Sequence, residues 1–158
     1  MKKTIILGVF LLTVLNACGQ KGNTPENKQW VFDYENILTD SQIDILDSII
    51  QNYENQTTNE IAIVTVENIG DFNKMVEYAV DFGDKYKIGK PEKNNGLVIL
   101  FSKNMRETFI ATGYGTEKIL KDEICKQIVD STMIPHFKKQ DYFSGLKAGL
   151  EECINKWK

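Results

Sequence analysis

An unbroken apolar run at residues 97–101 is the feature that most constrains the fold of this chain. It follows Asn94-Asn95-Gly96 and precedes a polar cluster at residues 102–106, so it predicts a buried strand between two turns. A second, more loosely alternating segment at residues 107–112 comes directly after that cluster. This spacing is typical of the returning strand of a β-hairpin.

The hairpin has a geometric consequence for the polar residues on either side of it. The loop that enters the first strand and the loop that leaves the second lie at the same end of the sheet, because the chain reverses between them. The amides of Asn94 and Asn95 and the carboxylate of Glu117 are therefore expected to converge there. The backbone of this end is supplied by Gly96, Gly113 and Gly115. We expect any ligand chemistry of the chain at this end, and Gly113 and Gly115 are expected to permit positive φ in a tight turn.

The first 17 residues have the pattern of an export signal. Lys2 and Lys3 precede an apolar run at residues 5–15. The run is shorter than the roughly 20 residues that a membrane-spanning helix needs, so it predicts a cleaved signal peptide.

A cysteine follows the small residue at the end of this segment, in Leu15-Asn16-Ala17-Cys18. The pattern resembles bacterial lipoprotein signals, in which the cysteine is lipidated and becomes the new N-terminus. An ordinary signal peptide with an incidental cysteine is the alternative. Because Gly19 rather than an aspartate follows, we expect a lipid anchor in the outer membrane, facing the periplasm.

Processing would leave an acidic chain with one domain. The full chain has 19 basic and 22 acidic side chains, and removal of residues 1–17 leaves 17 against 22, a net charge of −5. This balance, without a stripe of Lys and Arg, argues against nucleic-acid binding. Residues 18–29 are a polar tether, and residues 30–158 are long enough for a single globular core.

The first half of this domain alternates strand and helix signals. A short apolar segment at residues 30–34 is followed by Thr39, with Gln42 three residues later, which is the pattern of a helical capping box. Apolar residues then recur at helical spacing through residues 40–54. A β-branched stretch at residues 60–66 predicts the next strand.

Three further helices are predicted. One is capped by Asp71 or Asn73, one begins at the cap Asp122 and stops at Pro135, and the last begins at Asp141. The first of them is expected to bury Phe72, Val76, Ala79, Val80, Gly83 and Tyr86. Cys125 and Cys153 fall on apolar helix faces and are expected to be buried free thiols, although an oxidising compartment would permit a disulfide.

The order of these elements predicts the fold class. Strand, helix and strand make a right-handed parallel crossover, and the hairpin adds an antiparallel strand. The predicted architecture is a three-layer α/β/α sandwich in which helices flank both faces of a small mixed sheet.

Several of these segments together resemble the TPM domain family. They are Val31-x-Asp33-x-x-Asn36, Glu60-Ile61, Asn95-Gly96-Leu97-Val98, Gly113-x-Gly115-x-Glu117, Asp122 and Asp141-Tyr142. The resemblance covers residues 31 to about 157 and implies an α/β/α sandwich in an anchored or exported envelope protein. Relatives in the thylakoid lumen are linked to photosystem repair. Some members bind divalent cations, and acid phosphatase activity is claimed for some and absent in others. Relatives often have an aspartate where this chain has Asn94, which removes a negative charge from the expected site.

Oxygen-bearing side chains make calcium, or else magnesium, the expected metal. Calcium accepts 6–8 oxygen ligands at flexible geometry. The expected ligands are Asp33, Asn94, Asn95, Glu117 and Asp122. The alternative is that Asp122 only caps its helix and Glu117 is a solvated surface residue. A zinc site is not expected, since His136 is the single histidine.

These observations lead to two hypotheses on function. The first is a lipid-anchored, calcium-binding interaction module that assembles or repairs an envelope complex through a protein partner. The second is a metal-dependent acid phosphatase that acts on phosphomonoesters. Arg106 could hold an anion, but the hairpin places it at the opposite end of the sheet from Gly96 and Gly113. No nucleophile with an adjacent base is evident.

Overall fold

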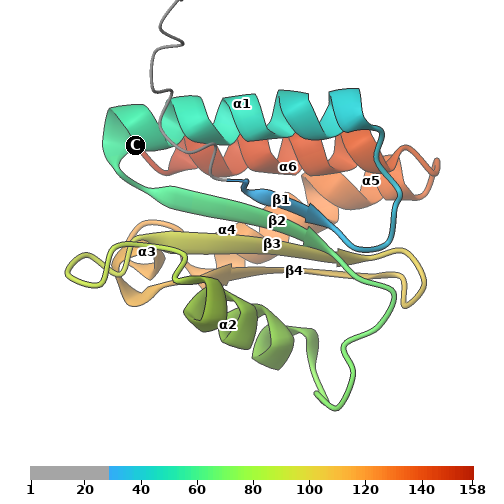
Figure 1. Cartoon of the computed structure of the whole chain (residues 1–158), viewed down its shortest axis with the longest axis horizontal. Coiled ribbons are helices and arrows are strands. Elements are labelled where there is room, and N and C mark those ends of the chain that lie inside the picture. The colour runs from blue at the N-terminus through green and yellow to red at the C-terminus, as the bar shows by residue number, and fades with distance from the viewer. Residues whose placement is uncertain (1–28) are drawn as a thin grey trace, which may run out of the picture.

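Four strands form one mixed sheet in the order β1-β2-β3-β4. The computed structural model describes residues 29–158 (Figure 1). The strands are β1 (Val31–Asp33), β2 (Glu60–Thr65), β3 (Gly96–Ser102) and β4 (Glu107–Thr112). β1, β2 and β3 are parallel, and β4 is antiparallel to β3. The predicted hairpin is therefore confirmed.

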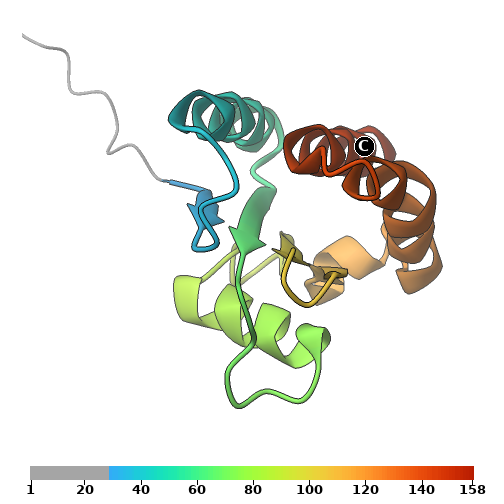
Figure 2. The ribbon, with the colours of Figure 1, turned by 90° about the vertical axis from the view of Figure 1, so that its right-hand side faces the viewer.

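Helices cover both faces of this sheet. α1 (Asp40–Thr57) and α6 (Tyr142–Lys156) lie on one face, and α2 (Met75–Tyr86) covers the other (Figure 2). The predicted three-layer α/β/α sandwich is thus confirmed. None of the helices within residues 29–158 has the length and apolarity that a membrane span requires.

The two faces of the sheet have separate cores, which explains the unbroken apolar run in β3. Leu97 and Ile99 pack with α1 and α6, whereas Val98 and Leu100 pack with α2. A strand buried on both faces needs apolar residues at successive positions rather than at alternate ones. Every residue of β3 is accordingly buried.

The start of a helix was predicted correctly where the capping residue and its partner lie close together in the sequence. Thr39 and Gln42 form the predicted capping box, and α1 runs to Thr57, three residues beyond its expected end. The Asp141 side chain accepts a hydrogen bond of 3.1 Å from the Ser144 N–H at the start of α6. Both caps were correctly predicted, because a capping pattern involves residues only three apart.

The prediction for α2 was wrong in its start and in most of its buried face, although Ala79 is buried as expected. Lys74 is at the N-cap position without a side-chain cap, so neither Asp71 nor Asn73 caps this helix. Its buried residues are Met75, Ala79 and Phe82. Val80 is 50% exposed, and Phe72 and Tyr86 are also exposed. Two apolar stripes of helical spacing run along this segment, and only packing against the sheet decides which one is buried.

The segment after β4 also differs from its prediction. α3 (Tyr114–Glu117) is a single turn, and α4 (Asp122–Ile128), a π-helical turn η1 (Val129–Met133) and α5 (Ile134–Phe137) follow one another without a break. Asp122 is the first residue of α4 rather than its cap, which is Lys121. Pro135 does not stop the helix. It lies in the first turn of α5, where a missing N–H is tolerated.

Cys125 and Cys153 are free and buried, as expected. Burial raises the pKa of the Cys125 thiol to about 11 and raises the pKa of Cys153 further. Both groups therefore behave as small apolar side chains in the core on the α1 and α6 face.

Candidate functional site

The loops on either side of the hairpin meet at one end of the sheet, which we call the Gly96 end. The Gly113 N–H donates to the Gly96 carbonyl at 2.9 Å, and the Gly115 N–H donates to the Asn94 carbonyl at 3.0 Å. The Thr116 hydroxyl also donates to the Gly96 carbonyl, at 2.9 Å. The predicted convergence of these two loops is therefore observed.

The glycines at this end are required for close approach, and the expectation of positive φ was wrong for Gly113 and Gly115. A Cβ atom on Gly113 would lie 2.4 Å from the Asn94 carbonyl oxygen. One on Gly115 would lie 2.0 Å from the carbonyl oxygen of Lys93. Backbone atoms cannot yield easily, so these positions exclude side chains because the two loops touch.

Asn95 has a structural role that uses its whole amide group. Asn95 is buried, and its side-chain Oδ1 accepts a hydrogen bond of 2.8 Å from the Lys90 N–H. Its Nδ2 donates to the Thr58 carbonyl at 3.0 Å and to Asn59 Oδ1 at 2.9 Å. Asn95 thus joins the connection between α1 and β2 to the loop before β3. Asn94 is exposed beside it, with φ of 48°, a conformation that asparagine tolerates well.

A buried ion pair at the Gly96 end was missed from the sequence. Glu60 is 1% exposed, and its Oε1 lies 2.5 Å from Lys90 Nζ. Its Oε2 accepts from the Gly89 N–H at 2.6 Å. The one available signal was an acidic residue at the first position of an otherwise apolar strand. Such a residue is more often at the surface.

Glu117 and Asp122 lie near each other, as predicted. Both are exposed, and both line a shallow hollow of about 380 Å³ together with Glu123. Lys118 and Lys121 line the same hollow and offset part of the acidic charge.

Asp33 does not belong to this group, so its inclusion with the other expected ligands was wrong. It lies at the far end of the sheet, because β1 is parallel to β3 and its last residue is on the side of Ser102. Its carboxylate accepts from the Leu38 N–H at 2.8 Å and from the Ile37 N–H at 3.3 Å. The Thr65 hydroxyl donates to it as well. These bonds fix the loop between β1 and α1.

The expected five-ligand calcium set therefore fits the structure poorly. Asp33 is at the other end, and the amide of Asn95 is engaged elsewhere. Within residues 29–158 there is no group of three or more His, Cys, Asp and Glu side chains arranged to hold a metal ion. The exposed carboxylates of Glu117, Asp122 and Glu123 share one hollow at this end, and the exposed Asn94 does not line it.

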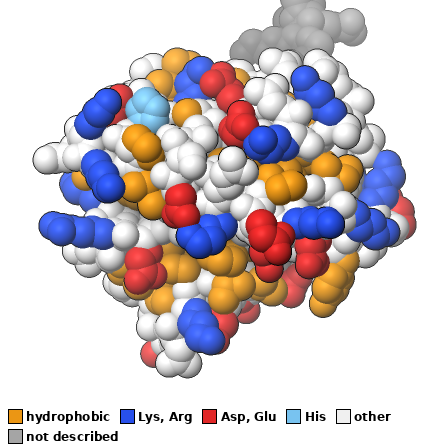
Figure 3. All heavy atoms as spheres, turned by 180° about the vertical axis from the view of Figure 1, so that it is seen from behind, with side chains coloured by type: hydrophobic (Ala, Val, Ile, Leu, Met, Phe, Trp, Pro, Cys, Tyr) orange, Lys and Arg blue, Asp and Glu red, His pale blue; other side chains and the backbone are white. Residues whose placement is uncertain are grey.

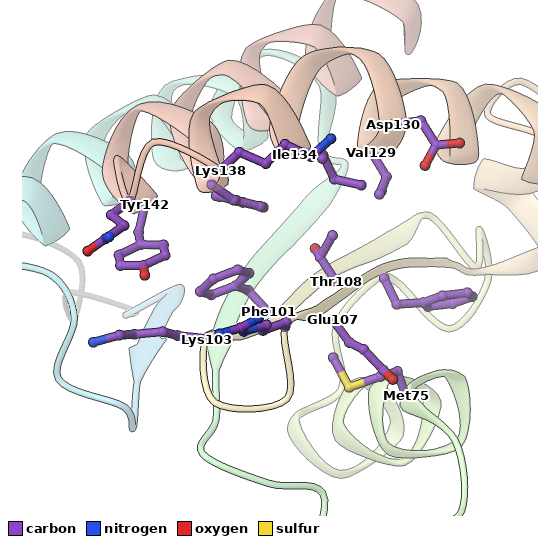
Figure 4. A pocket seen from close by; sticks show the side chains of 14 residues that line it. Met75, Phe101, Lys103, Glu107, Thr108, Val129, Asp130, Ile134, Lys138 and Tyr142 are labelled. Atoms are coloured by element: carbon purple, nitrogen blue, oxygen red, sulfur yellow. The ribbon is translucent and has the colours of Figure 1, made fainter.

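The opposite end, which we call the Ser102 end, has a larger hollow that the sequence did not predict. It measures about 980 Å³ and lies between the first residues of β4 and the helical segment from η1 to α6 (Figure 4). Arg106 lines it, at the hairpin turn where the sequence had placed this residue. Its walls come from residues 75, 101–109 and 129–142, so no single stretch of sequence signals it.

Charges of both signs are mixed on the surface. On the face seen from behind, Lys and Arg side chains alternate with Asp and Glu (Figure 3).

Comparison with known proteins identifies the family. The TPM domain family matches residues 31–156, which is most of the chain. The chain belongs to the TPM domain family. No curated protein matches it.

Three solved structures have a similar fold. The N-terminal domain of a protein from P. gingivalis is 26% identical, with a TM-score of 0.74 over 82% of each chain. The BA42 protein from Bizionia argentinensis is 19% identical, with a TM-score of 0.66 over 79% of this chain and 88% of its own. The N-terminal domain of the cg2496 protein from Corynebacterium glutamicum is 13% identical, with a TM-score of 0.65 over 87% of this chain and 85% of its own. At 19% and 13% identity, the last two likenesses bear on the fold alone.

Proposed function

We propose that this TPM domain is tethered to the bacterial cell envelope by a lipid on Cys18 and acts there as a cation-dependent interaction module. Cys18 lies outside the described residues, so the tether rests on the lipoprotein-like pattern in the sequence. The polar segment 18–29 would let the domain reach a partner protein from the membrane surface.

The observation that carries the cation proposal is the shared hollow of Glu117 and Asp122. Calcium accepts carboxylates together with backbone carbonyls and water, so two acids can hold it if water supplies most of the other ligands. Such a site is weak. We expect a dissociation constant in the range of extracellular calcium modules, about 10⁻⁴–10⁻³ M. Magnesium, which keeps several of its waters, is a second candidate for the same pair.

Binding is favoured over phosphate-ester hydrolysis by the separation of the groups that hydrolysis would need. Glu117 and Asp122 follow the last residue of β4, whereas Arg106 precedes its first. A metal at the Gly96 end and the guanidinium at the Ser102 end therefore cannot act on one phosphoryl group within one chain.

A calcium titration followed by amide NMR on the full chain tests the cation site. Amides of Glu117, Asp122 and Glu123 should shift together and saturate, while those at Arg106 should not move. Asp122→Asn should weaken binding about tenfold, since it removes one of two carboxylate ligands. Its stability should change little, because Asp122 does not cap its helix. Asp44→Asn on the exposed side of α1 is the matched control.

Two results would contradict the proposal. One is binding that is not specific to this site. It would appear as shifts scattered over surface acids that saturate only at very high calcium, or as a loss of affinity in Asp44→Asn equal to that in Asp122→Asn. The other is release of phosphate from an aryl phosphate that Asp122→Ala abolishes, which would support the phosphatase instead.

A further inference from the structure

The hollow at the Ser102 end has the size and the walls of a small-molecule site. Its volume of about 980 Å³ lies at the upper end of the range for organic ligands, which is roughly 300–1,000 Å³. Most of its lining lies between the start of β4 and the helical segment above it, and Met75 of α2 extends it past β4 (Figure 4).

Aromatic rings form one side of this hollow. The ring of Phe101 lies 4.4 Å from that of Phe137 and 5.5 Å from that of Tyr142, measured between centroids. Val129 and Ile134 point from the helical segment toward Thr108 on β4 (Figure 4). A flat apolar ligand could therefore stack on the aromatic rings and contact the side chains of Val129 and Ile134 on the opposite side.

Three cations surround the aromatic side. Lys103, Arg106 and Lys138 all line the hollow, and within residues 29–158 none of them forms an ion pair with a carboxylate. Lys103 Nζ lies 5.6 Å from the centroid of the Tyr142 ring. The acids of the hollow are Glu107 and Asp130.

One of these two acids already has a cationic partner. Asp130 pairs with Lys126 one helical turn away, so Glu107 is the single acid opposed to the three cations. The hollow therefore has an excess of positive charge, whereas the whole chain has a net negative charge. This local excess favours a negatively charged ligand.

The backbone of β4 adds polar groups to the same place. β4 is an edge strand, so its outer N–H and C=O groups face no further strand. The Gly113 N–H donates to the Gly96 carbonyl, and the strict alternation of antiparallel pairing then turns the backbone groups of Thr108 away from β3. Thr108 lines the hollow, so a ligand there meets these groups.

From these contacts we infer that the Ser102-end hollow binds a small aromatic organic anion. Its ring lies against Phe137 and Tyr142, which pack on the buried Phe101, and its carboxylate or phosphate is held by Lys103, Arg106 and Lys138. The site is separate from the Glu117 and Asp122 hollow and does not depend on a cation there.

Arg106 allows a variant that removes a ligand contact without weakening the fold. Its φ is 59°, a left-handed conformation that favours glycine. Arg106→Gly therefore removes the guanidinium while relieving the backbone, so its melting temperature should equal or exceed that of the wild type. Lys87 has φ of 53° and lies at the end of α2, outside this hollow. Lys87→Gly makes the same change in charge and backbone there and is the matched control.

The test is an amide NMR titration of the full chain with 2-naphthoate. Amides of Phe101, Lys103, Arg106, Thr108 and Lys138 should shift and saturate together. Arg106→Gly should weaken binding about tenfold, since hydrogen bonds to charged groups contribute that much, and Lys87→Gly should leave it unchanged. The neutral naphthalene-2-carboxamide should bind at least about tenfold more weakly than 2-naphthoate.

Three results would overturn the inference. The first is the absence of saturable shifts at the hollow with millimolar 2-naphthoate. The second is equal binding of the carboxamide, or an unchanged affinity in Arg106→Gly, because either shows that the cations do not act on the ligand. The third is binding of an acidic peptide at this place without binding of 2-naphthoate, which would make the hollow a protein-docking groove.

Discussion

Replacing Lys90 by methionine should lower the free energy of unfolding by about 2–3 kcal/mol. The change keeps most of the volume of the side chain and removes its charge. Glu60, whose side chain is 2% exposed, then keeps a buried carboxylate without the cation that lies 2.5 Å from it.

The magnitude follows from the position of the pair. Removing one partner of a fully buried ion pair costs about 3–5 kcal/mol, whereas an exposed pair contributes about 0–1 kcal/mol. The Lys90 side chain is 38% exposed, so water already screens its end of the pair. The Gly89 N–H, 2.6 Å from Glu60 Oε2, still stabilises the carboxylate in the variant. Because of both facts, the expected loss in the free energy of unfolding is smaller than that for a fully buried ion pair but well above that for an exposed one.

Urea denaturation followed by circular dichroism measures the effect, with a double-mutant cycle to isolate the pair. Glu60→Gln combined with Lys90→Met should recover part of the loss, because the double variant has no carboxylate at position 60. Lys147→Met is the control, since Lys147 pairs with Glu151 on the exposed side of α6. It should cost less than about 0.5 kcal/mol.

The pH dependence gives a second readout. The hydrogen bond to Glu60 raises the pKa of Lys90 above its usual value of 10.5. A raised pKa means that the folded state holds the proton more tightly, so the contribution of the pair is complete below pH 10.5 and is lost as the pH rises through the raised pKa. The difference between wild type and Lys90→Met should thus be constant from neutral pH to about pH 10 and shrink above it. Comparing the difference between the two proteins removes the titrations that they share.

A loss below about 1 kcal/mol with a coupling energy near zero would refute the reasoning. It would mean that Glu60 and Lys90 behave as a screened surface pair despite the burial of the carboxylate. A loss in the Lys147→Met control as large as that in Lys90→Met would have the same consequence, because it would show a general effect of removing a positive charge.

Three further predictions follow from burial and from the export signal. Ile99→Asp places a charge at a fully buried position of β3 and should cost more than about 4 kcal/mol; a melting temperature within a few degrees of wild type would contradict the central place of this strand. Cys18→Ser should abolish labelling by a fatty-acid analogue, and undiminished labelling would exclude lipidation of Cys18. Cys125 and Cys153 should react with a thiol reagent at least about a hundredfold more slowly in the folded chain than in urea, since both are buried and their pKa values are raised; fast reaction of both would show that this core opens readily.

The sheet and the helix caps could be predicted from sequence because their signals are local. The run at residues 97–101, which lies between two turn signals, predicted a buried strand, and the short polar turn after it predicted an antiparallel return. The cap residues Thr39 and Asp141 are recognised from partners three residues away. None of these inferences needed knowledge of distant contacts.

The errors concern features that distant contacts decide. Asp122 and Lys121 are adjacent in the sequence. Which of them caps α4 depends on the path of the chain between α3 and α4. Pro135 continues a helical segment because the π-helical turn before it changes the hydrogen-bond pattern. The buried face of α2 is fixed by the sheet beneath it, which no local pattern describes.

The misplacement of Asp33 bears directly on where a ligand should be sought. Its carboxylate and that of Glu35 are both engaged by backbone N–H groups at the Ser102 end, Glu35 by those of Lys103 and Asn104 at 2.9 and 2.8 Å. The polar residues near the ends of the strands therefore hold loops in place, and this also applies to Asn95 and Glu60 at the Gly96 end.

The topology of the sheet favours the Ser102 end for ligand binding. In open α/β sheets, ligands bind outside the carboxyl ends of the parallel strands. Here β1, β2 and β3 all end on the side of Ser102, and the larger hollow lies on that side as well. At the Gly96 end, by contrast, the space above the sheet is filled by loops that touch so closely that a Cβ on Gly115 has no room. The motif that is most conspicuous in the sequence thus builds a packed junction, and the ligand-sized hollow is assembled at the other end from segments that share no sequence pattern.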